Sequence, residues 1–97
     1  TWRLNGATAE ARKQQAQLMV QAFEAARPEV PGLLHMHVGS NVIDAPDAWD
    51  VALYMAFASR THLEAYQAHP SHLAIKQLVG PMRFARCQVD FELPGQP

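Results

Sequence analysis

The stretch Val51 to Val79, "VALYMAFASRTHLEAYQAHPSHLAIKQLV", combines a strand pattern with two short helical patterns that a proline separates. Its first seven residues alternate between two faces, as the period of two in a strand requires. One face carries Val51, Leu53, Met55 and Phe57, and the other carries Ala52, Tyr54 and Ala56. Ser59 is a typical N-cap for a helix ending near Gln67, and Pro70 suits the first turn of a second helix that ends near Val79.

The residues before this stretch predict two strands with a long helix between them. "TWRL" is typical of the end of a strand, and Thr8 is a good N-cap for a helix over residues 9–27. Its apolar positions at helical spacing are Leu18, Met19, Ala22, Phe23 and Ala26. "RPEVPG" (27–32) ends the helix, and residues 33–43 read as a strand. Alternation puts Leu34, Met36 and Val38 on one face of that strand and Leu33, His35 and His37 on the other.

The residues after it predict a last strand over 83–93. Its apolar face would carry Ala85, Cys87, Val89, Phe91 and Leu93, and its polar face Arg86, Gln88, Asp90 and Glu92. The predicted order is therefore β-α-β-β-α-β, with the second helix split. This is the α+β, ferredoxin-like arrangement, a four-stranded antiparallel sheet with its helices on one face. We expect a single domain over residues 1–97 whose first strand begins upstream of Thr1.

Composition excludes several classes of function. The chain has 97 residues and a formal net charge of −1, with no basic run of the kind that binds nucleic acid. Its apolar runs are too short to span a membrane. The single cysteine, Cys87, cannot form an intramolecular disulfide and is typical of a reducing compartment, so we expect a cytoplasmic protein.

"AYQAHPSHLAI" (65–75) is the candidate site. Pro70 disfavours helical geometry at His69, so His69 falls at the helix break and His72 in the first turn of the new helix. The positive end of that helix disfavours an imidazolium, so His72 is expected to be neutral and able to act as a general base. Tyr66 can orient a carbonyl or donate to an oxyanion. We expect both to face a mostly apolar pocket for a small ligand, lined by Phe23, Met36, Leu53, Met55, His69 and Ile75.

Two simpler interpretations compete with this pocket. His69 and His72 can serve the helix join alone, and the apolar residues can be core. A metal site would need His35 and His37 together with His69 and His72, but strand parity puts the two pairs on opposite sides of the sheet. We therefore expect neither a metal nor a cofactor.

The sheet face away from the helices predicts a homodimer. Two helices cover only one face of a four-stranded sheet, and a domain this small gains stability from a partner. The second face would carry Leu33, His35, His37, Ala52, Tyr54, Ala56, Arg86 and Gln88. An apolar centre within a polar rim is common at protein interfaces. We expect His35, His37, Tyr54 and Arg86 to contact the partner.

Four segments resemble the stress-responsive dimeric α+β barrel family, called Dabb. They are "VPGLLHMHVG", "DVALYMAFAS", "AYQAHPSHLAI" and "VDFEL", and the run Tyr66-x-x-His69-Pro70-x-His72 is the most specific. The resemblance implies a ferredoxin-like subunit that pairs sheet to sheet with a second copy, and a small-ligand-binding or stress-associated role of undefined activity. It also implies an alternative, because olivetolic acid cyclase, a relative, uses a His and a Tyr at the positions of His72 and Tyr66 to cyclise a polyketide. A purely structural dimer is the third possibility.

Overall fold

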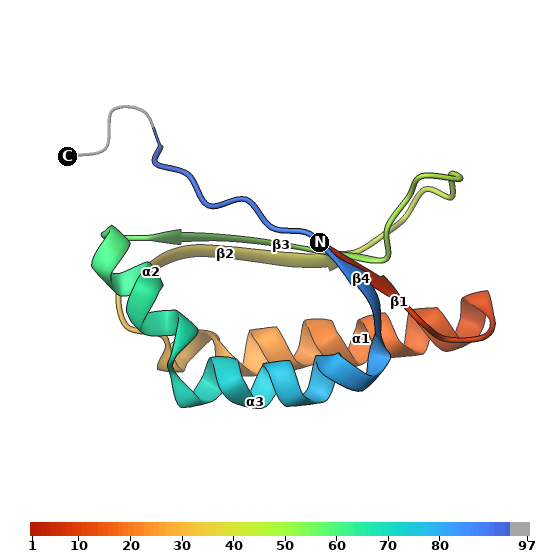
Figure 1. Cartoon of the computed structure of the whole chain (residues 1–97), viewed down its shortest axis with the longest axis horizontal. Helices are drawn as coiled ribbons and strands as arrows, with labels where there is room; N and C mark the ends of the chain where they lie inside the picture. Colours follow the sequence, from red (N-terminus) through yellow and green to blue (C-terminus); the bar gives the residue numbers. More distant parts are fainter. Residues whose placement is uncertain (94–97) are drawn as a thin grey trace.

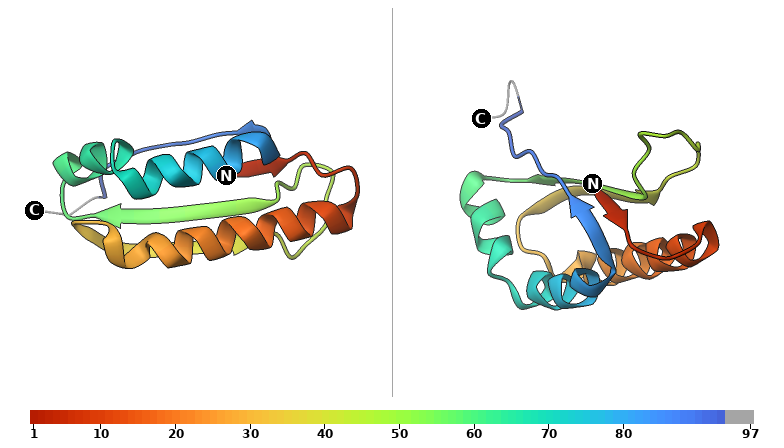
Figure 2. Two further views of the ribbon diagram at one scale, coloured as in Figure 1. Left: turned by 90° about the horizontal axis from the view of Figure 1, so that it is seen from below. Right: turned by 45° about the vertical axis from the view of Figure 1, so that its right-hand side comes forward.

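A computed structural model describes residues 1–93, which form an antiparallel four-stranded sheet with the helices packed on one of its faces. Figures 1 and 2 show this layering, with α1 and α3 side by side below the sheet. The predicted ferredoxin-like α+β fold is confirmed. The elements in chain order are β1 (Trp2–Leu4), α1 (Ala9–Ala26), η1 (Arg27–Glu29), β2 (Leu33–Ser40), β3 (Val51–Phe57), α2 (Arg60–Gln67), α3 (Pro70–Val79), η2 (Gly80–Met82) and β4 (Arg83–Arg86).

The sheet has the strand order β2-β3-β1-β4, so β2 and β4 are its edges. The long β2–β3 ladder runs from Leu33↔Phe57 to Ser40↔Val51. Strand β1 pairs with β3 only at Trp2↔Val51. Beyond that pair, the Asp50 carboxylate accepts the Leu4 backbone N–H at 2.8 Å. A side chain therefore replaces a ladder hydrogen bond where the two strands diverge.

Side-chain caps fix where the helices begin, as the sequence predicts. The Thr8 hydroxyl accepts the Ala11 N–H at 3.1 Å and starts α1, and the Ser59 hydroxyl accepts the His62 N–H at 3.2 Å and starts α2. Each such cap satisfies one N–H that a helix cannot pair internally.

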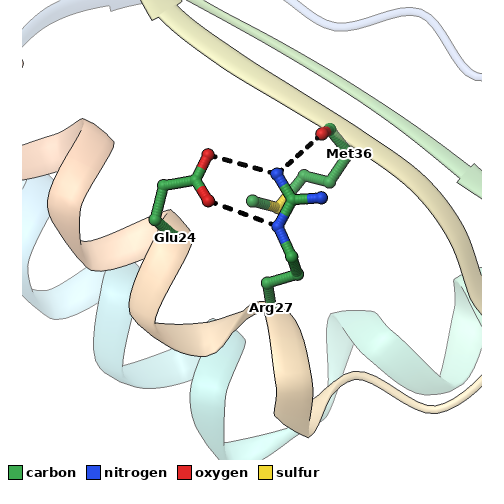
Figure 3. A network of polar contacts seen from close by, with 3 residues as sticks. All are labelled: Glu24, Arg27 and Met36. Atoms are coloured by element: carbon green, nitrogen blue, oxygen red, sulfur yellow. Dashed lines mark hydrogen bonds and ion pairs between the residues drawn. The ribbon is translucent and has the colours of Figure 1, made fainter.

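The end of α1 is tied to β2 by a polar contact that alternation does not reveal. Arg27 forms two hydrogen bonds to the Glu24 carboxylate, at 3.1 and 3.2 Å, and donates a third to the Met36 carbonyl at 2.9 Å (Figure 3). The carboxylate holds the guanidinium in position. The contact fixes the helix end over the middle of β2.

The core lies between the sheet and the helices. Helix α1 contributes Ala16, Met19 and Phe23, whereas Leu18 is half exposed and outside the core. The buried cluster consists of Trp2, Leu4, Ala16, Met19, Phe23, Met36, Val51, Ile75 and Val79. Trp2 and Phe23 are in tilted ring contact at 5.6 Å, which joins the inner strand β1 to the last turn of α1.

A bulge at the start of β2 corrects the predicted faces of its two leucines. The register shifts between Leu33 and His35, so Leu33 pairs with Phe57 while His35 pairs with Ala56. An extra residue in one strand reverses the side-chain alternation on one side of the bulge. Leu33 therefore packs against the core, and Leu34 is 53% exposed. The assignment of Leu33 to the second face and of Leu34 to the helix side was wrong, whereas Met36 and Val38 lie as expected.

The last strand is shorter than predicted and has a different parity. It ends at Arg86, and residues 87–93 have no regular secondary structure. Arg86 lies across from the buried Trp2, and cross-strand partners share a face. Arg86 is therefore on the helix side of the sheet, not on the second face. Figure 1 shows the following segment leaving the sheet on the side away from the helices.

Candidate functional site

The join between α2 and α3 is built by His69 and Pro70. His69 has extended backbone angles (φ −70°, ψ 141°), and its Nδ1 accepts the Ser71 N–H at 3.1 Å. Pro70 occupies the first turn of α3, where its missing N–H has no intrahelical partner to lose. His69 thus acts as the N-cap of α3. This agrees with the interpretation that His69 serves the helix join. With its Nδ1 bonded to the backbone, His69 is not a pocket residue.

Tyr66 and His72 come together across this join. Tyr66 lies in the last turn of α2 and His72 in the first turn of α3, and their rings meet edge to face with centroids 4.6 Å apart. Phe57, at the end of β3, contacts Tyr66 with centroids 5.5 Å apart. Tyr66 is only 6% exposed, and His72 is half-buried. The proline break therefore places the two most reactive side chains of the motif in contact.

The surroundings keep both side chains neutral near pH 7. Burial lowers the pKa of His72 below its usual value, and the positive charges of Lys76 and Arg86 lower it further. Burial raises the pKa of Tyr66. The sequence predicts a neutral His72 from the field of the α3 terminus, but burial is the larger cause. His72 is thus an available proton acceptor, and Tyr66 an available donor.

The polar atoms of this pair lack partners in the protein. Within residues 1–93, His72 Nδ1 is the one enclosed side-chain nitrogen or oxygen without a hydrogen bond. The Tyr66 hydroxyl also makes no hydrogen bond to these residues, yet it is not enclosed, so solvent reaches it. Buried polar groups are almost always paired, and leaving one unpaired costs about 1–3 kcal/mol. His72 Nδ1 is therefore the unsatisfied enclosed atom among the described residues, whereas water can pair with the Tyr66 hydroxyl.

The remaining residues of the predicted pocket fill the core instead. Phe23, Met36 and Ile75 belong to the buried cluster, and Leu53 and Met55 pack against it. These residues pack in or against the core between the sheet and the helices, and Ile75 also borders a surface hollow, so their place in a ligand pocket stays a prediction.

Two hollows occur elsewhere on the surface. One, of about 300 Å³, lies between α1 and α3 and is lined by Ala22, Ala25, Ala26, Glu29, Ser71, Ala74, Ile75 and Leu78. The other, of about 410 Å³, lies beside α1 and the end of β2 and is lined by Gln17, Val20, Gln21, Gly39 and Ser40. Neither includes Tyr66 or His72.

The face of the sheet away from the helices carries the predicted histidines. His37 stacks on Tyr54 across the β2–β3 ladder, with ring centroids 6.2 Å apart and planes at 26°. His35 lies opposite Ala56 on the same ladder. Across residues 1–93, no three His, Cys, Asp or Glu side chains are close enough to hold a metal ion.

Cys87 lies just beyond β4 and is a free, exposed thiol. The prediction of an apolar strand face at this position was wrong, because the strand ends one residue earlier. In the part of the chain that the structure describes, none of the helices has both the length and the apolar character needed to cross a membrane.

Residues 1–93 match the family described as the stress responsive A/B barrel domain, Dabb. The chain belongs to the Dabb family. No curated protein matches the sequence, and the similarity to olivetolic acid cyclase stays a prediction.

Two solved structures resemble the Dabb domain described above. One is a dimeric protein of unknown function with a ferredoxin-like fold from Bacteroides fragilis NCTC 9343. It is 24% identical, with a TM-score of 0.81 over 95% of this chain and 89% of that one. The other is a dimeric ferredoxin-like protein of unknown function from Thermobifida fusca YX. It is 25% identical, with a TM-score of 0.81 over 95% of this chain and 84% of that one.

Sequence reasoning about this Dabb domain missed the role of Arg86. Alternation in the predicted last strand put Arg86 on the sheet face away from the helices. In the structure, the charge of Arg86 contributes to lowering the pKa of His72. The signal available in the sequence was weak. The pairing of Arg86 with Trp2 joins the two ends of the chain, and no local pattern in the sequence indicates it.

Proposed function

We propose that this Dabb domain binds a small, mostly apolar molecule at the Tyr66–His72 pair. The observation that supports this most directly is the unpaired state of both side chains, with His72 Nδ1 enclosed and the Tyr66 hydroxyl reachable from solvent. A ligand carbonyl or hydroxyl beside the pair would supply the missing hydrogen-bond partner. Phe57, which packs against Tyr66, provides an apolar neighbour for the ligand body.

The working form in this proposal is a homodimer. The open sheet face carries the stacked His37 and Tyr54, and the segment after β4 exposes Val89 and Phe91 at 82% and 67%. Apolar side chains this exposed are covered when a second copy packs against the same face. Both similar structures are described as dimeric. His35, His37 and Tyr54 remain proposed interface residues, and Arg86 does not.

A second candidate is proton-transfer catalysis of the polyketide-cyclase type. The lowered pKa of His72 favours it, because a general base must be unprotonated at the working pH. In this reaction, His72 takes a proton from a carbon next to a substrate carbonyl, and Tyr66 donates a hydrogen bond to the enolate oxygen that forms. The new carbon–carbon bond then forms by attack of that enolate carbon on a second carbonyl of the same chain, whose oxygen becomes a hydroxyl by taking up a proton.

The filled core favours a third role, a dimer that binds no ligand. Solution NMR can distinguish this role from ligand binding and from catalysis. Wild-type protein would be titrated with small aromatic ketones and phenols while the ring signals of Tyr66 and His72 are followed. Binding at the pair shifts both rings, and Tyr66→Phe weakens the interaction by about three- to tenfold through the lost hydrogen bond. His62→Gln, a histidine on α2 bonded to Ser59, is the matched control and leaves the titration unchanged.

Ring signals that no compound of this chemistry moves would refute the binding proposal and leave the structural dimer. Binding without turnover of a linear poly-β-ketone would refute only the cyclase. We also propose a stress-related role and a cytoplasmic location, the first from the description of the family and the second from the free thiol of Cys87.

A further inference from the structure

Residues 88–93 keep the pattern of a strand, although no strand within residues 1–93 pairs with them. Arg86 donates to the side-chain oxygen of Gln88, whose amide donates to the Asp90 carboxylate at 2.7 Å. Side chains two residues apart share a face of an extended chain, so this row of contacts fits a strand. On the other face, Val89 and Phe91 are 82% and 67% exposed. The segment therefore alternates as a strand does, without a neighbour to pair with.

Strand β3 has a matching unpaired edge. In the described part of the chain, β1 pairs with β3 at Trp2↔Val51 alone, and residues 52–57 pair only with β2. Yet β3 lies inside the sheet, between β2 and β1. A strand directs its backbone N–H and C=O groups to both sides, so one side of β3 lacks partners along residues 52–57.

Thr1 lies where these two unpaired edges meet. Its carbonyl accepts the Cys87 N–H at 3.0 Å, and its nitrogen donates to the Cys87 carbonyl at 3.2 Å. This mutual pair continues the β1–β4 ladder one residue beyond Trp2↔Arg86. In Figure 2 (left), the N-terminus lies between β3 and the segment that follows β4. A strand that continued β1 beyond Thr1 would therefore enter between the two edges.

We propose that an extended segment preceding Thr1 continues β1 and pairs with both β3 and residues 88–93. Only β1 separates β3 from β4 in the sheet, so one strand is enough to bond to both edges. A segment joined to Thr1 enters this position directly, whereas a strand from a second copy would also lose the freedom of a separate molecule. The inference does not depend on ligand binding at the Tyr66–His72 pair.

The two ladders fix the register of this segment. Because both pairings are antiparallel, the residue before Thr1 stands opposite Leu53 on β3 and Gln88 on the other side. The second residue before Thr1 stands opposite Tyr54 and Val89. Residues 88–93 then become the edge strand of a longer sheet, as the alternation in the sequence predicts.

The register also gives the chemistry of the segment. Trp2 is buried on the helix side, so the first and third residues before Thr1 face that side too. They lie beside Leu53 and Met55, which pack against the core, and are expected to be apolar. The second residue lies between Tyr54 and Val89 and joins them on the face proposed to contact a second copy.

The test adds the six residues Thr-Val-Thr-Val-Thr-Val before Thr1, so that the valines face the helix side. Amide hydrogen exchange is followed by NMR in this extended chain and in the 97-residue chain, at the same protein concentration. The amides of residues 88–92 are expected to exchange at least about tenfold more slowly in the extended chain, because a ladder now protects them. The melting temperature is expected to rise as well.

The matched control carries proline in place of the three added valines. Proline has no N–H to donate and does not fit the interior of a sheet, so this extension should leave the exchange of residues 88–92 unchanged. Equal exchange with and without the valine extension overturns the proposal, and so does equal protection by the proline extension. Protection in the 97-residue chain that grows with protein concentration would assign the position to a second copy and overturn the proposed occupant.

Discussion

Replacing Met36 by alanine tests whether the inner face of β2 is core or pocket wall. Met36 is 2% exposed and lies in the middle of the β2–β3 ladder opposite Met55. It packs within the cluster that includes Phe23 and Ile75. A residue that lined a ligand cavity would have free volume on one side, so its truncation would remove few contacts. Met36 has close neighbours throughout, so its truncation leaves an empty volume.

The expected loss follows from this burial. Truncating a fully buried methionine to alanine costs about 2–5 kcal/mol, which combines the transfer of the lost atoms and the cavity that remains. The backbone carbonyl of Met36 is also held by Arg27, so β2 cannot relax easily to fill the space. We therefore expect the upper half of that range. For a domain of this size, a loss of about 4 kcal/mol lowers the melting temperature by roughly 16–32 °C.

Leu34→Ala is the matched control, because simple alternation gives Leu34 and Met36 the same face. The bulge leaves Leu34 53% exposed, so its truncation should cost less than about 1 kcal/mol. Urea unfolding of both variants, at two protein concentrations to separate any loss of dimer contacts, measures the difference. Equal losses for the two variants at both concentrations would refute the bulge and the core assignment together.

Four further outcomes are expected. The free energy of unfolding of the wild type falls as the pH drops below about 6.5, because the folded pKa of His72 is lowered and the unfolded chain takes up the proton first. In His72→Gln, the urea midpoint changes less with pH in this range. Asp50→Ala lowers the free energy of unfolding by about 1–3 kcal/mol, because the Leu4 N–H loses its partner, and a loss near zero in calorimetry would contradict that role. Chelator treatment leaves the melting temperature unchanged, whereas loss of a structural metal would lower it sharply. The dimer weakens in sedimentation runs when His35→Asp and His37→Asp are combined, because the interface would then bury two unpaired carboxylates, and an unchanged dimer would contradict the proposed interface.

The fold could be predicted from the sequence because its main signals are local. Thr8 and Ser59 cap their helices with the hydrogen bonds that their position implies. Pro70 begins α3 as predicted. The alternation in β3 also holds from Val51 to Met55, because its ladder with β2 is regular beyond the bulge. Each of these features depends on a few neighbouring residues, and those are what a single sequence displays.

The bulge in β2 and the end of β4 could not be predicted, because both depend on residues far apart in the chain. Leu33 and Leu34 are chemically identical, and which one faces inward is decided by the pairing with Phe57. Strand β4 ends at Arg86, opposite Trp2 of β1, and this pairing joins residues from the two ends of the chain. A pattern of alternating residues indicates a strand, but it does not say whether a partner strand exists to pair with it.

The same difference between local and long-range signals applies to the candidate site. The contact between Tyr66 and His72 follows from a short motif, in which the proline turns α3 back so that residues six apart meet at 4.6 Å. The charge near the two rings does not follow from this motif. Arg86 belongs to the last strand, and its side of the sheet is fixed by the pairing with Trp2. A neutral histidine and a buried tyrosine alone suit many ligands. The local motif therefore brings the pair together, whereas its electrostatic surroundings depend on a strand pairing that a single sequence does not display.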